Sequence, residues 1–175
     1  MEIRRLTAAD AAEFQALRLR GLLESPEAFG STHADEVGRP LDVVAARLAD
    51  PSSGFVLGAT LEPSGPLVGL TGCYRESSRK RRHVAIIWGM FVAPEARGQG
   101  IGGALLDAAV AGAAEWDGVE QVTLTVVTEK VAAHALYVSR GFRSFGIEPR
   151  ALRDEWRHYD MDYLWRPLDT HTHTR

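Results

Sequence analysis

A glycine-rich turn constrains the fold of this chain more than any other feature of its sequence. The turn follows an apolar run and reads Arg97-Gly98-Gln99-Gly100-Ile101-Gly102-Gly103. The segment behind it has helical spacing, and the first backbone N–H groups of a helix lack internal partners and carry partial positive charge. Glycines remove the side chains that would keep an anion from those groups. The turn therefore predicts a strand-to-helix unit that binds phosphate, with Arg97 adding a charge-assisted hydrogen bond.

Other interpretations of the turn explain fewer of its residues. It is not a P-loop, because no Lys-Ser or Lys-Thr pair follows the glycines. It does not fit a dinucleotide-binding fingerprint, because the glycine spacing differs and the preceding strand follows a hairpin instead of opening a βαβ unit. A tight turn with positive φ would account for one or two glycines, but not for glycines at 98, 100, 102 and 103 beside an arginine.

The apolar pattern around the turn predicts one α/β (α+β) domain over residues 1–168, built on a mixed central sheet. We expect about six to seven strands, at 2–6, 54–62, 66–75, 83–92, 119–127, 142–147 and 156–165. We expect about four helices flanking the sheet, at 8–25, 40–48, 100–116 and 130–140. The strand at 83–92 is apolar on both faces, as a central strand should be. The tail at 169–175 is expected to be disordered.

Composition narrows the class of protein. The formal net charge is −3, which does not mark a nucleic-acid binder, and no apolar run reaches the length of a membrane span. The first residues lack a secretory apolar region, and Cys73 is the one cysteine, in an apolar stretch that predicts a core position. We therefore expect a protein of the reducing cytoplasm with no membrane partner. No cluster of Cys and His residues indicates a metal site.

A second block of residues lies downstream of the turn. It reads Lys130-Val131-Ala132-Ala133-His134-Ala135-Leu136-Tyr137-Val138-Ser139-Arg140-Gly141-Phe142. With the turn, this block resembles the GNAT acetyltransferase superfamily, in particular a small bacterial branch. The acetyl-CoA signature of that superfamily is Arg/Gln-x-x-Gly-x-Gly/Ala, and its later block is Asn-x-x-Ala-x-x-Leu-Tyr-x-x-x-Gly-Phe. The resemblance covers about residues 2–165, and Lys130 replaces the asparagine of the later block.

The resemblance implies acetyl-CoA as the cosubstrate and indicates which residues hold it. Backbone groups of Phe91 and Val92, with Ala93 at the edge, would pair with the pantetheine arm as an added strand, where two parallel strands splay apart. The pyrophosphate would bind the turn, at Arg97, Gly98, Gln99, Gly100, Ile101, Gly102 and Gly103. The family's asparagine usually helps to hold the coenzyme arm. Lys130 either reaches a phosphate instead or is a solvated residue at a helix start.

The resemblance also places Tyr137 in the chemistry. Amide formation expels a thiolate, and a neutral phenol, with a reference pKa of about 10, can donate a hydrogen bond or a proton to sulfur. A backbone N–H near Met90 or Phe91 would stabilise negative charge on the carbonyl oxygen.

The group that takes the proton from the acceptor amine is not identified by the sequence. Many members of the superfamily use a glutamate on the central strand, but residues 84–92 contain no acid. His83, just before this strand, is the nearest candidate, because imidazoles commonly act as bases. A solvated histidine that closes a basic loop is the alternative interpretation. Other candidate bases are Asp35, Glu36 and Glu129.

The acceptor side is predicted from an irregular acidic segment at residues 24–36. In GNAT folds the loop between the first two helices usually lines the acceptor cleft, so the resemblance implies that Phe29, Glu36 and Trp88 bind the acceptor. Acidic side chains there would favour a cationic amine, such as a polyamine, an aminoglycoside or a basic peptide. A solvated acidic loop is the alternative.

Three functional hypotheses follow. The first is an acetyl-CoA-dependent N-acetyltransferase that transfers the acetyl group directly to an amine of a small molecule or peptide. The second is a GNAT-fold module that senses acyl-CoA without turnover, which the lack of an acid at 84–92 favours. The third is a nucleic-acid accessory protein that uses the basic loop at 79–82, although no aromatic residue interleaves with it. A homodimer is one expectation by analogy with the superfamily.

Overall fold

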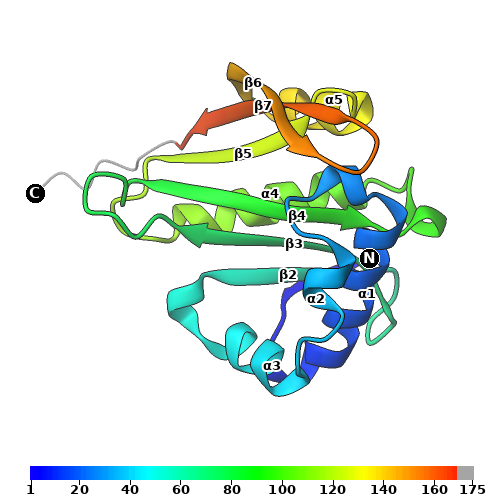
Figure 1. The fold of residues 1–175 in the computed structure, drawn as a ribbon. Helices are drawn as coiled ribbons and strands as arrows, with labels where there is room; N and C mark the ends of the chain where they lie inside the picture. Colours follow the sequence, from blue (N-terminus) through cyan, green and yellow to red (C-terminus); the bar gives the residue numbers. More distant parts are fainter. Residues whose placement is uncertain (169–175) are drawn as a thin grey trace, which may run out of the picture.

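Seven strands form one mixed sheet at the centre of the computed structural model, which describes residues 1–168 (Figure 1). The strand order is β1-β2-β3-β4-β5-β7-β6. The neighbours β4 and β5 are parallel, and the other neighbouring pairs are antiparallel. The strands are β1 (Glu2–Arg5), β2 (Phe55–Thr60), β3 (Leu67–Arg75), β4 (Val84–Val92), β5 (Gln121–Val127), β6 (Arg143–Arg153) and β7 (His158–Pro167).

Helices cover both faces of this sheet. Helices α1, α2 and α3 lie on the face that is turned toward the viewer in Figure 1, and α4 crosses behind β3 and β4. Among the described residues the α-helices are α1 (Ala11–Glu24), α2 (His33–Glu36), α3 (Leu41–Ala49), α4 (Ile101–Ala114) and α5 (Val131–Ser139). The predicted fold, one domain with a mixed sheet flanked by helices, is confirmed.

Local signals in the sequence place several helix ends correctly. The carboxylate of Asp10 accepts hydrogen bonds from the backbone N–H and the hydroxyl of Thr7, at 2.7 and 3.0 Å, just before α1. Gly141 ends α5 with φ of +84°, a conformation that glycine adopts without steric cost. The irregular segment at 24–36 holds a 3₁₀ turn at Pro26–Ala28 and the single-turn helix α2. Helix α2 was not expected from the sequence and brings the α-helices of the described residues from four to five.

The core is formed where α4 packs on the sheet. Leu105, Leu106, Ala109 and Ala113 are fully buried, as their helical spacing predicts. Gly69 on β3 permits this close approach, because an added Cβ would lie 3.0 Å from Leu105. Cys73 is fully buried in β3, so its predicted core position is confirmed.

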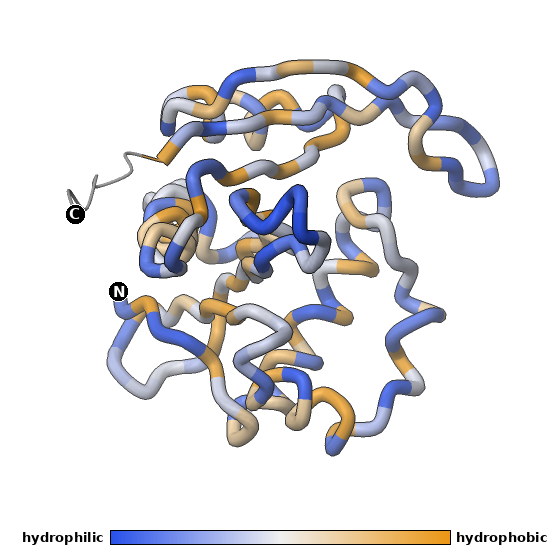
Figure 2. The backbone as a smooth tube through the Cα atoms, turned by 90° about the vertical axis from the view of Figure 1, so that its left-hand side faces the viewer, coloured by the Kyte–Doolittle hydropathy of each residue, from blue (hydrophilic) through white to orange (hydrophobic). Residues whose placement is uncertain are grey.

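Strand β6 runs further than the predicted 142–147 and continues to Arg153. Pairing with β7 is interrupted between Glu148 and Leu152, where Arg150 adopts a φ of +56°. The sequence pattern ends at Pro149 because proline cannot donate to a ladder, but an edge strand tolerates that loss. Hydrophilic and hydrophobic positions alternate along the top of the molecule, where β5, β6 and β7 lie (Figure 2).

The predicted disordered tail at 169–175 lies outside the described residues. None of the helices within 1–168 combines the length and the apolar character needed to cross a bilayer.

Candidate active site

A cleft opens where the two parallel strands of the sheet separate. Strands β4 and β5 pair only from Val84 to Ile86 on β4 and from Gln121 to Thr123 on β5. Beyond these residues each strand keeps its outer neighbour, β3 or β7, but no longer pairs with the other. A first cavity of about 530 Å³ lies between the separated ends. Its volume is in the range of small-molecule sites.

A β-bulge in β4 shapes this cleft. Leu70 pairs with Phe91 and Gly72 pairs with Trp88, so Gly89 and Met90 together oppose Thr71. Gly89 has a φ of +69°, which only glycine adopts readily. The extra residue shifts the alternation of side chains, and a bulge leaves part of the backbone outside the ladder. The hydroxyl of Thr71 donates to the carbonyl of Trp88 at 3.1 Å and fixes the bulge from the β3 side.

The glycines of the turn divide between two structural tasks. Gly98 and Gly100 have φ of +76° and +78°, and an added Cβ on either would meet no atom within 4 Å. Gly103 faces α5, where an added Cβ would lie 2.5 Å from Arg140, and Gly102 faces Leu136 at 3.3 Å. Two glycines therefore leave open space in front of α4, and two let α4 and α5 approach closely.

The start of α4 fits a phosphate group. The first intrahelical bond of this region runs from the N–H of Ala104 to the carbonyl of Gly100, at 3.0 Å. The N–H groups of residues 101–103 therefore have no partner within the helix. Gly98 and Gly100, just before these groups, leave space that side chains would otherwise fill, and the helix dipole favours an anion at this end of α4. The turn can thus hold the pyrophosphate expected from the sequence.

Arg97 lies in the wall of the first cavity and is oriented by β4. Its Nε donates to the carbonyl of Val92 at 3.0 Å, and its guanidinium lies 6.0 Å from the ring centre of Phe91. The ring of Phe91 packs on Gly21 of α1. Phe91 and Val92 line the cavity, whereas the N–H of Ala93 donates to Val68 on β3 at 2.8 Å, so it faces away from the cleft.

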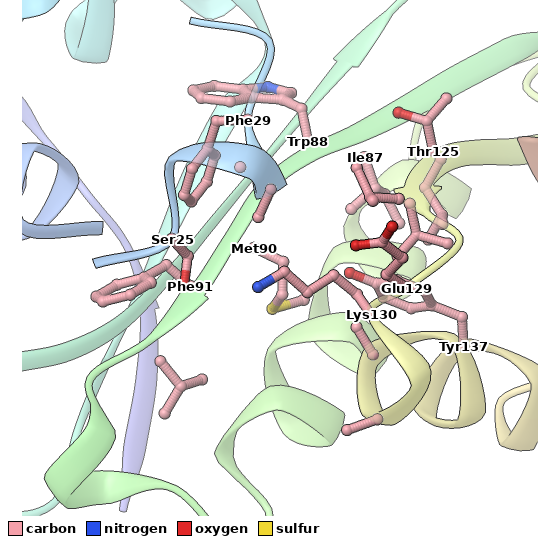
Figure 3. Close-up of a pocket in the computed structure, with 18 of the residues that line it drawn as sticks. Ser25, Phe29, Ile87, Trp88, Met90, Phe91, Thr125, Glu129, Lys130 and Tyr137 are labelled. Carbon is pink, nitrogen blue, oxygen red and sulfur yellow. The ribbon is translucent and has the colours of Figure 1, made fainter. Parts of the chain in front are cut away.

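Tyr137 is buried and lines the same cavity, on the side formed by α5 (Figure 3). Its ring packs edge-on against Phe142, with centroids 6.3 Å apart. Burial raises the pKa of the Tyr137 phenol to about 12. The side chain is therefore a neutral hydrogen-bond donor at physiological pH.

Lys130 precedes α5 and forms an ion pair with Glu27 of the 3₁₀ turn at Pro26–Ala28. Neither interpretation from the sequence included a partner within the chain. Burial would raise the pKa of Glu27, but hydrogen bonds and the charge of Lys130 outweigh it and hold that pKa below its usual range. The pair joins the segment that carries Phe29 to the start of α5, across the first cavity.

The structure does not bring His83 to the cleft. This residue lies before β4, at the paired end of the two parallel strands, and its carbonyl accepts from the N–H of Glu120 at 2.8 Å. The cavity begins at Ile87 on β4, which is roughly 13 Å further along an extended strand. Of the other candidate bases, Asp35 caps α2 through Thr32 and lies outside the cavity. Glu129 lines it.

A second cavity of about 520 Å³ continues from the first on the other side of the bulge. Phe29, Trp88 and Gly89 line both cavities. The indole of Trp88 occupies the space above Gly72, where an added Cβ would approach it to 2.2 Å. Figure 3 shows the rings of Phe29 and Trp88 next to each other beside β4. The structure thus brings together two of the three residues predicted to bind the acceptor.

The third, Glu36, is engaged inside the protein. Its carboxylate forms a buried ion pair with Arg18, through Nε at 3.2 Å and Nη2 at 3.0 Å. Burial would raise the pKa of Glu36, but the hydrogen bonds and charge of Arg18 outweigh it, so the pKa lies below its usual range. The Nη1 atom of Arg18 is buried and has no hydrogen-bond partner within the described structure. An unsatisfied buried charged donor is costly, typically by more than about 1–3 kcal/mol.

Three of the four acids in the segment at 24–36 form ion pairs: Glu24 with Arg20, Glu27 with Lys130, and Glu36 with Arg18. The fourth, Asp35, caps α2 through Thr32 and does not line either large cavity. The basis for expecting a cationic acceptor is therefore removed.

Sequence reasoning missed two features of this site. Arg18 lies four residues after Phe14 and four before Leu22, which are both buried, so helical spacing placed it on the inner stripe of α1. Gly89 interrupts an otherwise apolar strand, and an isolated glycine in a strand is a known signal for a bulge. Within residues 1–168, no three His, Cys, Asp or Glu side chains converge as metal ligands would.

Comparison with known protein families assigns the chain to one of them. The model of the acetyltransferase (GNAT) family matches residues 20–142, which include the end of α1, the glycine turn and the block that ends at Phe142. No curated protein matches the chain.

Solved structures share the fold over nearly the whole chain. A ribosomal-protein-alanine N-acetyltransferase from Brucella melitensis has 25% identity and a TM-score of 0.81, with 96% of this chain and 100% of that chain covered. A putative acetyltransferase from Salmonella typhimurium, solved with its cofactor acetyl-CoA, has 22% identity and a TM-score of 0.82, covering 100% and 98%. A phosphinothricin acetyltransferase from Sinorhizobium meliloti, in complex with acetyl-CoA, has 22% identity and a TM-score of 0.82, covering 99% and 91%.

Proposed function

Because the chain belongs to the GNAT acetyltransferase family, we propose that it transfers the acetyl group of acetyl-CoA directly to a primary amine of a small molecule or peptide. The observation that carries this proposal is the cleft between β4 and β5. It has Arg97 of the glycine turn and a buried tyrosine in its wall, and a second cavity lies beyond the bulge. A bound acetyl-CoA would supply an activated acetyl thioester in this cleft.

The residues of the turn would hold and orient the coenzyme. The N–H groups at the start of α4 and the guanidinium of Arg97 bind its pyrophosphate, and backbone groups of Phe91 and Val92 pair with its arm. The separated edges of β4 and β5 provide the unpaired backbone groups that such pairing needs. Of the two backbone N–H candidates, that of Phe91 points to β3, because Phe91 pairs with Leu70 and the N–H of Ala93, two residues on, donates to Val68. The N–H of Met90, in the bulge, would therefore donate to the carbonyl oxygen as negative charge develops there.

Transfer forms a bond from the amine nitrogen to the acetyl carbon and breaks the bond from that carbon to sulfur. Tyr137 donates its phenolic proton to the leaving thiolate. The proton lost by the amine passes to Glu129 or to water at the cavity. A covalent route through the thiol of Cys73 is disfavoured, because that side chain is fully buried and burial raises its pKa to about 12.

The test is release of free thiol from acetyl-CoA with a panel of amino acids, polyamines, aminoglycosides and peptides, with coenzyme binding measured in parallel by calorimetry. We expect micromolar-range binding and turnover on at least one amine class. Tight coenzyme binding without turnover on any amine would contradict the proposal and favour an acyl-CoA sensor, which the absence of an acid at 84–92 makes a second candidate.

A further inference from the structure

Three arginines gather on the α1 side of Trp88, next to the second cavity. A small cavity of about 150 Å³ is lined by Arg18, Arg39 and Arg47, together with Ser31, Glu36 and Trp88. We call it the arginine cavity. Glu36 is its one carboxylate, so three guanidiniums share a single negative charge.

The contacts of Arg18 leave one nitrogen of its guanidinium without a hydrogen-bond partner among the described residues. Glu36 binds Nε and Nη2, and Ser31 Oγ also accepts from Nη2 at 3.2 Å. The remaining atom, Nη1, is directed to β4 and lies 3.5 Å from the position that a Cβ on Gly89 would occupy. The side chain is 7% exposed, and Nη1 has no partner among the described residues. A buried donor of this kind calls for an acceptor.

The surroundings increase the excess of positive charge. The guanidinium of Arg47 lies 4.9 Å from the ring centre of Trp88, and that of Arg18 lies 5.8 Å from it. Burial, together with the charge of Arg39, lowers the pKa of Arg47. Cations that are partly desolvated and close to one another are stabilised when an anion binds between them.

We infer that the acceptor amine also carries an anionic oxyacid group, a carboxylate or a phosphorus oxyacid, which binds at Arg18 Nη1 beside Arg47 and Trp88. The inference rests on the proposed function, because it names the acceptor class of the same site. Gly89 borders both large cavities. An anion at Nη1 therefore directs the amine of a small α-amino acid, or of its phosphonate analogue, toward the cleft between β4 and β5.

The first experiment compares acceptors that differ only in this charge. Thiol release from acetyl-CoA is measured with L-alanine, L-methionine and L-phenylalanine, with the amide of each, and with 1-aminoethylphosphonate and its dimethyl ester. We expect the anionic member of at least one pair to have a kcat/KM that is on the order of tenfold to hundredfold higher, as one charge-assisted hydrogen bond supplies. An amide group makes the neighbouring amine less basic, so intrinsic reactivity at neutral pH favours the amide. A preference for the acid therefore reports binding.

The second experiment removes the positive charge while keeping the fold. Arg47→Gln leaves the buried pair of Arg18 and Glu36 intact, and we expect it to reduce the preference for the anionic acceptor about tenfold through KM. The double variant Arg18→Gln with Glu36→Gln removes the pair without leaving an isolated buried charge, and it should abolish the preference. Arg79→Gln, in the exposed basic loop, is the matched control and should leave the preference unchanged.

Measuring the affinity of the acceptors tests the inference independently of whether any of them is acetylated. Protein saturated with coenzyme A, which occupies the phosphate site, is titrated calorimetrically with the same pairs. Stronger binding of the anionic members that is lost in Arg47→Gln supports the inference, even if no amine is acetylated. Equal kcat/KM values and equal affinities within every pair, or the same preference in the double variant, would overturn it. Absence of thiol release with every amine contradicts the proposed function alone.

Discussion

Tyr137 combines burial with access to the cleft. Its ring is fixed against Phe142, its side chain lines the first cavity, and its phenol has a pKa of about 12. A phenol with this pKa remains protonated well above neutral pH, so it can donate to a leaving thiolate but cannot act as the base for an amine. The two proton transfers of the proposed reaction therefore need two different groups.

We predict that Tyr137→Phe lowers kcat by about 10²-fold or more, the usual contribution of a positioned proton donor. The affinity for coenzyme A should change little, because the turn at the start of α4 is untouched. Steady-state kinetics and calorimetry measure the two quantities. Tyr159→Phe, which loses a hydroxyl that bonds to Asp154 away from both cavities, is the matched control. Unchanged turnover in Tyr137→Phe would remove this residue from the mechanism.

Position 100 favours glycine because of its backbone conformation, and not because a side chain there would clash with a neighbour. Its φ is +78° and no atom would lie within 4 Å of an added Cβ. Gly100→Ala should therefore destabilise the fold by about 1 kcal/mol and weaken coenzyme binding, since the left-handed conformation costs alanine about 1–2 kcal/mol. Gly38→Ala, where an added Cβ is also unobstructed and φ is not positive, is the control. Denaturant melts and calorimetry would contradict the assignment if both variants behaved alike.

At the scale of elements, the ion pair of Glu27 and Lys130 joins two segments that lie far apart in the sequence. Glu27 lies in the turn between α1 and α2, and Lys130 lies at the start of α5. Lys130 lines the first cavity, as do Ala28 and Phe29, which follow Glu27. We therefore expect the pair to affect how closely the 24–36 segment covers a bound coenzyme. A direct contact of Lys130 with a coenzyme phosphate is the alternative, and the two predict different patterns in a mutant series.

We predict that Lys130→Gln, Glu27→Gln and the double variant each raise the KM for acetyl-CoA by the same factor, about two- to fivefold, because they break one partly exposed ion pair. Initial-rate kinetics at saturating amine measure this. If Lys130→Gln alone had a much larger effect than Glu27→Gln, Lys130 would be a phosphate ligand, and the ion pair would not be its main role.

The elements themselves were largely predictable from sequence because their periods are strong. The helical spacing of the apolar residues in α4 predicts a helix, and the continuous apolar run of β4 predicts a buried strand. The glycine-rich turn predicts the connection between them. The single turn α2 was not predictable, since its four residues are too few to show a period. The continuation of β6 past Pro149 depends on its place at the edge of the sheet, which only the three-dimensional order of strands reveals.

At the scale of the whole molecule, the buried pair of Arg18 and Glu36 ties α1 to α2 and shapes the acceptor side. Glu36 has a lowered pKa in the folded protein. Its stabilising contribution is therefore fully present above the unfolded pKa of about 4.3 and is lost as the pH falls through the folded value.

Glu36→Gln should lower the free energy of unfolding by about 3 kcal/mol at pH 7, because it leaves Arg18 buried without its counter-charge. The difference from the wild type should shrink as the pH falls from the unfolded pKa of about 4.3 toward the lowered pKa of Glu36 in the folded protein, because below that pKa the wild-type carboxylate is itself protonated. Urea melts from pH 3 to pH 8 measure this, with Glu62→Gln in the exposed hairpin loop as the control. A difference that stays constant with pH would contradict the ion-pair interpretation.

The strand, turn and helix start of the proposed coenzyme side could be predicted from the sequence, whereas the side chains that gather on the proposed acceptor side could not. Phosphate binding depends on a local turn and one helix start, which are adjacent in the chain. The acceptor side joins Arg18, Phe29, Arg47 and Trp88 from four different segments, and the partners of Glu27 and Glu36 lie on other elements. Charge counted along residues 24–36 therefore suggested a cationic acceptor, although three of the four acids form ion pairs within the folded chain and Asp35 lies outside the large cavities.

The early separation of β4 and β5 has a consequence for self-association. Unpaired strand edges normally invite other chains to add strands, which leads to aggregation. Here two such edges face each other inside the sheet, on either side of the first cavity, so they are not at the outer edge where another chain would add a strand. The outer edge at β6, by contrast, is blunted by Pro149 and by the interrupted pairing around Arg150. The unpaired edges of β4 and β5 are therefore available for backbone pairing with a small bound molecule, as proposed for the coenzyme arm, and not with another protein chain.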